Sequence, residues 1–189
     1  MDNDLGSQLL QDAEHNFRQL KKLADGAIAQ IDDDQFLARI DPESNSIALL
    51  MKHLGGNMRS RWTDFLTSDG EKPDRHRDAE FEQGPDATLA LVTSLWEEGW
   101  MCAFTAMAAL VPADLLQRVR IRGESHTVVQ ALNRQLTHTA YHVGQIVLLA
   151  KHLRSADWRS LSIPRGQSQE FNEAMRRKAA ADPAGAPDV

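Results

Sequence analysis

The chain has little cysteine and few aromatic residues, and each shortage excludes a class of protein. The single cysteine, Cys102, cannot close an intrachain disulfide, so a small disulfide-stapled secreted domain is excluded and a reducing cytoplasm is the expected location. Aromatic residues make up only 6% of the sequence, and Tyr141 is its one tyrosine. Because Ala and Leu are abundant, this composition favours helices over a β-sandwich or β-barrel.

A basic excess and a long apolar run are also missing. The chain has 21 Lys and Arg residues against 27 Asp and Glu residues, a net charge of −6. We expect no nucleic-acid partner, because a phosphate-backbone binder carries a basic excess or stripe. The longest nearly apolar run, Trp100 to Val111, contains Thr105 and is shorter than the ~20 residues of a membrane-spanning helix, so we expect no membrane partner. The first residues lack the basic and apolar regions of a signal peptide.

What the chain does have is the size and composition of one globular domain. It has 189 residues, of which 42% are hydrophobic and 25% charged, which excludes a disordered chain and is enough for a sizeable core. We predict that residues 1–180 form a single domain. Residues 181–189 are expected to form a disordered tail, because chain ends that are not tied down usually fray.

Four segments repeat apolar residues at steps of three and four, which is the period of a helix. These segments cover, approximately, residues 4–32, 46–67, 86–110 and 129–153. Asp86 is the expected N-cap of the third helix, and Pro112 ends it. A short further helix is predicted at residues 169–178. The fold class that follows is all-α, namely an up-down four-helix bundle with a short C-terminal extra helix.

The segments outside the regular helical pattern give weaker indications. Nine of the fifteen residues from Asp69 to Gln83 are charged, which indicates a solvated loop with His76 on its surface. The alternation from Arg118 to Arg122 is compatible with a short extended piece. The pair Gly55-Gly56 inside the second helix indicates either close approach of a neighbour or a local kink.

The seven histidines are the only concentrated source of chemistry in the sequence. His138 and His142 lie one helical turn apart, within reach of one metal ion, although two histidines so spaced often have no joint role. On helical wheels these two and His53 lie beside the apolar stripes of their helices, where a side chain either lines a cleft or faces solvent. Three others are assigned structural or surface positions: His15, His76 and His152. His126 is too far from His138 along a continuous helix to share an ion with it, but a later start of the fourth helix would let it approach the site from a loop.

Longer stretches resemble a known family. The second helix with one His, and the pattern His-xxx-His-x-Gly-Gln-Ile in the fourth, resemble the DinB-like (YfiT-like) superfamily, in particular a branch of unknown function. The similar blocks span about Ser46 to Ser168, and they are SIALLMKHLGGNMRSRWTDFLTSDGEKPDRHRDAEFE, EEGW, IRGESHTVVQALNRQLTHTAYHVGQIVLLAKHL and LSIPRGQS. The resemblance implies a metal-dependent four-helix bundle in which His53, His138 and His142 hold zinc or nickel. Three neutral imidazoles suit either ion and leave coordination positions open.

The resemblance also implies a function, since the superfamily includes thiol-dependent S-transferases and isomerases. We expect a metal-dependent transferase or hydrolase that activates a thiol or water for reaction with a small-molecule substrate. A low-molecular-weight thiol is then the expected co-substrate, and a homodimer is the expected assembly. The alternative is a non-catalytic protein that binds metal and a small ligand in stress or detoxification. A zincin is disfavoured because Thr139 stands where zincins have Glu, and no Glu-x-x-His pair indicates a di-iron centre.

Several other residues keep two interpretations, and the sequence assigns no catalytic residue. Asn57, Arg134 and Gln135 either orient the metal ligands or a substrate carboxylate, or are ordinary polar helix residues. The pair Glu97-Glu98 either supplies a general base or faces water. Cys102 is interpreted as a small buried hydrophobic residue. Three tryptophans either wall an apolar pocket or pack in the core, and the second is preferred for each: Trp62, Trp96 and Trp100.

Overall fold

The computed structural model describes residues 5–82, 84 and 88–181, and it is mostly helical, which confirms the all-α class. Its α-helices are α1 (Leu5–Ile28), α2 (Asp33–Leu37), α3 (Ile47–Trp62), α4 (Leu89–Ala108), α5 (Val128–Arg154) and α6 (Ser168–Ala181). The strands β1 (Arg118–Ile121) and β2 (Glu124–Thr127) pair as an antiparallel hairpin, so an extended piece is present where the alternation indicated one.

Side-chain oxygens cap the N-termini of the helices that carry the core. Ser46 accepts a hydrogen bond from the backbone N–H of Leu49 at the start of α3. Thr127 and Gln130 form a capping box at the start of α5. These bonds satisfy backbone N–H groups that have no partner inside a helix. Thr88 caps α4, which begins at Leu89; the predicted cap, Asp86, lies outside the described residues.

Two predicted helix ends were wrong. The helix predicted to reach residue 67 ends at Trp62, and Asp64 has a positive φ of 47°. The helical spacing continues in the sequence because Phe65 packs on Trp62 from the turn, with ring centroids 4.5 Å apart. The helix predicted to reach residue 32 ends at Ile28, since Asp32 caps the separate short helix α2.

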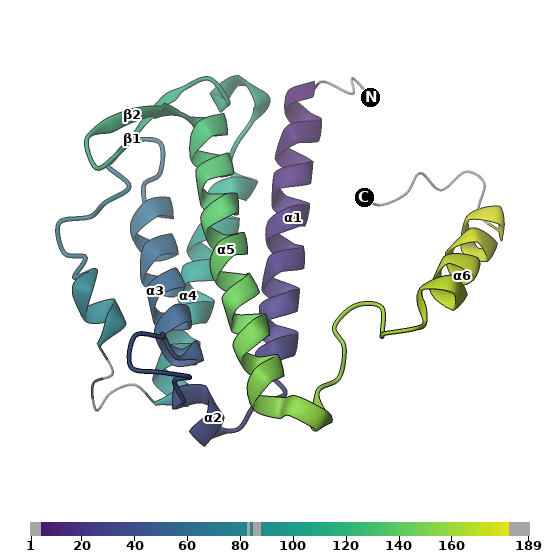
Figure 1. Cartoon of the computed structure of the whole chain (residues 1–189). Helices are drawn as coiled ribbons and strands as arrows, with labels where there is room; N and C mark the ends of the chain where they lie inside the picture. Colours follow the sequence, from purple (N-terminus) through teal and green to yellow (C-terminus); the bar gives the residue numbers. More distant parts are fainter. Residues whose placement is uncertain (1–4, 83, 85–87, 182–189) are drawn as a thin grey trace.

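The four long helices, α1, α3, α4 and α5, lie alongside one another, with α3 against α4 and α1 against α5 (Figure 1). Gly55 meets Leu95, and further along both helices Arg59 lies 3.8 Å from Glu98, so α3 and α4 run in the same direction. The alternation of direction predicted for an up-down bundle is therefore not seen at this pair. Residues 63–88 join the two helices and are long enough to return along the ~30 Å of a 20-residue helix.

Glycine allows the backbones of α3 and α4 to touch. A Cβ atom on Gly99 would lie 2.6 Å from the carbonyl oxygen of Gly55, and one on Gly55 would lie 2.5 Å from that of Leu95. Of the two interpretations of Gly55-Gly56, close approach of a neighbour is therefore the one the structure shows. The three tryptophans pack in the core, each at most 2% exposed, and the first of them also lines an apolar cavity: Trp62, Trp96 and Trp100.

The C-terminal helix lies apart from the other long helices in Figure 1. Each residue of α6 is exposed, and the helix extends beyond the predicted range 169–178 at both ends. The predicted disordered tail falls almost wholly on residues 182–189, which lie outside the described residues. In the part of the chain that is described, none of the helices combines the length and the apolar character that crossing a membrane requires.

Candidate metal centre

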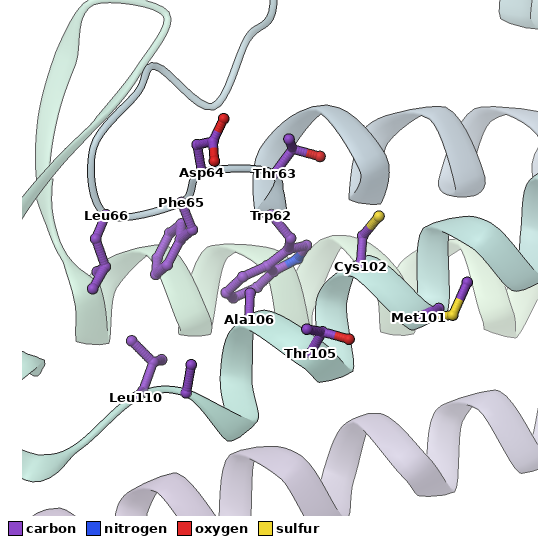
Figure 2. Close-up of a pocket in the computed structure, with 11 residues that line it drawn as sticks. Trp62, Thr63, Asp64, Phe65, Leu66, Met101, Cys102, Thr105, Ala106 and Leu110 are labelled. Carbon is purple, nitrogen blue, oxygen red and sulfur yellow. The ribbon is translucent and has the colours of Figure 1, made fainter.

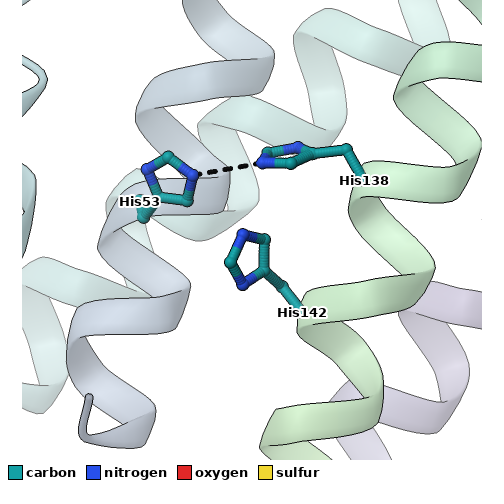
Figure 3. A group of neighbouring side chains, drawn as sticks. All are labelled: His53, His138 and His142. Carbon is teal, nitrogen blue, oxygen red and sulfur yellow. Dashed lines mark hydrogen bonds between the residues drawn. The ribbon is translucent and has the colours of Figure 1, made fainter. Parts of the chain in front are cut away.

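Three histidines from two helices converge on one point of the structure. His53 projects from α3, and His138 and His142 project from successive turns of α5 (Figure 3). One ring nitrogen from each lies within 4.8 Å of the other two, and Nε2 of His53 lies 3.2 Å from Nε2 of His138. Since zinc binds imidazole nitrogen at ~2.0–2.1 Å, two such ligands of a tetrahedral ion lie ~3.4 Å apart. The 3.2 Å between His53 and His138 suits two ligands of one ion, and the third ring nitrogen is close enough for His142 to be a candidate ligand of the same ion.

Side chains of the protein orient two of these imidazole rings through contacts at their Nδ1 atoms. His53 donates a hydrogen bond from Nδ1 to Oε2 of Glu80 at 2.8 Å, and Nδ1 of His142 lies 2.9 Å from Oε1 of Gln145. A proton on Nδ1 leaves the lone pair of Nε2 free for a metal ion. This is the arrangement that metal-ligating histidines usually have.

Burial favours the neutral imidazoles of His138 and His142. It lowers the pKa of His138 to about 3, and nearby charges on His142 and His53 act in the same direction. Burial also lowers the pKa of His142, although the hydrogen bond to Gln145 opposes the shift. The Nδ1 atom of His138 is buried without a hydrogen-bond partner among the described residues. Neutral imidazole is the form that binds metals.

Glu80 was missed by the sequence analysis, which interpreted residues 69–83 as a solvated loop. Glu80 is only 7% exposed, and Nε and Nη2 of Arg75 each lie 2.8 Å from one of its carboxylate oxygens. Burial raises the pKa of this carboxyl, but the hydrogen bonds from His53 and Arg75 outweigh burial and hold the pKa below 4.5. Glu80 is therefore a carboxylate that accepts the hydrogen bond from His53.

A single feature of the sequence could have indicated this buried part of the loop. Phe81 is the one large apolar residue between Asp69 and Gln83, and its ring lies on that of His53 with centroids 4.6 Å apart. Gly56 lets the loop lie close to α3, because a Cβ atom at this position would overlap the carboxylate of Glu80. The loop thus folds back on α3, and the second glycine of the pair makes room for the residue that orients His53.

A pocket of about 390 Å³ opens beside the cluster. Asn57, Arg134, His53 and His138 line it, whereas Gln135 is fully buried and bonds to Thr139. Of the three polar residues with two interpretations, Asn57 and Arg134 thus face the same pocket as the histidines. The remaining lining residues are Arg61, Arg75, Arg77, Arg122, Thr137 and Tyr141.

The other histidines and the acidic pair lie outside this pocket. His126 belongs to β2, since α5 begins at Val128, and its Nε2 lies 3.6 Å from the carboxylate of Glu124. The carboxylates of the pair Glu97-Glu98 are about half exposed and lie beside Lys21 and Arg59. Solvent-facing ion pairs are therefore what the structure shows for the acidic pair.

A second cavity, of about 410 Å³, has a different character (Figure 2). It lies between the end of α3 and the C-terminal half of α4, and Trp62, Phe65, Met101 and Leu110 give it an apolar lining. Cys102 faces this cavity and is half-buried, less enclosed than the buried residue predicted. None of the three clustered histidines is among the residues that line it.

The fold and the cluster define a helical protein with a three-histidine group that could hold a metal ion. A family model matches residues 4–167, and the chain belongs to that family, which is described as "Protein of unknown function (DUF1572)". No curated protein and no solved structure matches the chain.

Proposed function

We propose that this protein is a metal-dependent enzyme acting on a small molecule, with His53, His138 and His142 as ligands of zinc or nickel. The observation that carries the proposal is the convergence of three ring nitrogens within 4.8 Å of one another. Among the described residues, no further His, Cys, Asp or Glu joins this group. Three protein ligands leave coordination positions open, which is typical of a catalytic rather than a structural site.

We also propose that the four long helices form a bundle of the DinB-like kind. Two observations support this assignment. The helices α1, α3, α4 and α5 contact one another in pairs, and the histidines come from α3 and α5, as the resemblance implies. An ion held by all three would link α3 to α5, so its binding would stabilise the folded protein.

The residues around the site support catalysis by fixing its geometry. A bound divalent ion would lower the pKa of a coordinated thiol or water and so supply a nucleophile at neutral pH. Glu80 and Gln145 hold the rings of His53 and His142, and burial keeps His138 neutral. The adjacent pocket, of about 390 Å³, has the size of a small-molecule site.

Turnover by the metal-loaded protein tests this proposal. Glutathione, cysteine and coenzyme A are each offered with a chlorinated aromatic electrophile, and an activated ester is offered with water. We expect turnover that requires zinc or nickel and is lost in His138→Ala but kept in His15→Ala. Rates that do not change when the metal is removed contradict the proposal. A protein that binds metal but turns over none of these pairs fits the alternative, a non-catalytic binding protein.

A further inference from the structure

The pocket beside the histidines is strongly basic although the chain as a whole carries a net charge of −6. Five arginines line it: Arg61, Arg75, Arg77, Arg122 and Arg134. No Asp or Glu is among its lining residues in the described part of the chain. A cleft lined by charge of one sign concentrates ligands of the opposite sign.

Part of this positive charge is already neutralised. Arg75 is held by Glu80 and also lies 3.1 Å from Glu71, whose carboxylate lies 3.3 Å from Arg122. Arg77 lies 3.6 Å from the exposed carboxylate of Asp78. These arginines therefore have acidic partners within the protein.

Two arginines of the pocket have no salt-bridge partner among the described residues. No described carboxylate lies within salt-bridge distance of Arg61 or Arg134, which stand on α3 and α5. Arg61 is only 5% exposed, and its Nε is buried without a hydrogen-bond partner. Burial, with the charges of Arg134 and Arg75, lowers the pKa of Arg61 to about 10, although the charge of Glu71, beyond salt-bridge distance, opposes the shift. The side chain of Arg61 therefore stays charged at neutral pH. A buried cation without a partner is costly, which makes an external anion the natural complement.

We propose that Arg61 and Arg134 bind an oxyanion group, a carboxylate or a phosphate, on the substrate of the three-histidine site. The planar guanidinium group matches both anions, because it donates two parallel hydrogen bonds. Both arginines line the same pocket as His53 and His138, so an anion bound there keeps the rest of a small molecule beside the cluster. That the bound molecule is a substrate rests on the proposed function, whereas the anion site itself does not.

Binding of simple anions to the metal-free protein tests the inference separately from metal and turnover. The probes are inorganic phosphate and succinate, each titrated by calorimetry into wild type and three variants. Arg134→Gln changes an exposed residue and is not expected to disturb folding. Arg61→Lys keeps the buried charge but loses the bidentate geometry. Arg59→Gln is the matched control, because Arg59 is on α3 but does not line this pocket.

We expect wild type and Arg59→Gln to bind at least one probe equally well, and the tighter probe identifies the anion class. Arg134→Gln and Arg61→Lys should each raise its Kd about tenfold, the effect of losing one charge-assisted hydrogen bond. No binding of either probe to wild type, or an unchanged Kd in both pocket variants, overturns the inference. If the anion binds as expected but the protein never binds metal, the proposed function fails while the anion site stands.

Discussion

Replacing Glu80 by Gln should weaken metal binding without removing a metal ligand. The carboxylate of Glu80 accepts hydrogen bonds from Nδ1 of His53 and from Nε and Nη2 of Arg75, each at 2.8 Å. The amide of Gln has one accepting oxygen in place of two, so Arg75 and His53 compete for it. Loss of a partner behind a ligating histidine typically lowers metal affinity ~10–100-fold. This corresponds to ~1.4–2.7 kcal/mol of binding free energy.

Calorimetric titration of zinc and of nickel into metal-free protein measures this effect, and thermal unfolding of the same samples reports on folding. Glu71→Gln is the control, since Glu71 also pairs with Arg75 but does not touch His53. We expect the metal Kd to rise ~10–100-fold in Glu80→Gln and to stay unchanged in Glu71→Gln. Equal metal affinity in Glu80→Gln and wild type would refute the argument that Glu80 orients His53.

Three further predictions concern the glycine pair, pH and assembly. Gly56→Ala should weaken metal binding, because the added Cβ displaces Glu80. Gly144→Ala is the control, since Gly144 has open space around it, and an equal loss of metal affinity in both variants would contradict the prediction. The folded pKa of about 3 for His138 lies below its ordinary 6.5, so the folded state binds fewer protons than the unfolded chain between these values. Urea unfolding of the metal-free protein should therefore show stability falling as pH drops through this window, less steeply in His138→Gln; equal slopes count against it. Light scattering at micromolar concentration should give the mass of a homodimer, and a monomer mass refutes it.

Periodic segments were predictable because burial of one helix face imposes a three- and four-residue repeat. The helix predicted at residues 129–153 is α5, Val128–Arg154, since an apolar stripe runs along its whole length and Thr127 caps it. The same repeat misled at Phe65, which packs on Trp62 from a turn. Apolar spacing records which side chains are buried, whatever the backbone between them does.

The part of the site that lies outside the helices could not be predicted in this way. Glu80 and Arg75 belong to a run of charged residues with no period, so nothing in their spacing separates the buried pair from exposed neighbours such as Asp78. Their burial depends on the return of residues 70–82 along α3, a contact that no repeat in the sequence records. The parallel direction of α3 and α4 could not be predicted either, because the apolar spacing of a helix does not show which way it runs relative to its neighbour.

The metal content of the natively purified protein tests the central claim most directly. Elemental analysis after desalting should find one zinc or nickel ion per chain in wild type and a sharp loss in His53→Ala, His138→Ala and His142→Ala. His126→Ala should keep the ion, because His126 lies in β2 and outside the three-histidine group. Loss of the ion in His126→Ala with retention in His53→Ala, or a wild-type protein that binds neither ion when both are supplied, would contradict the proposed site.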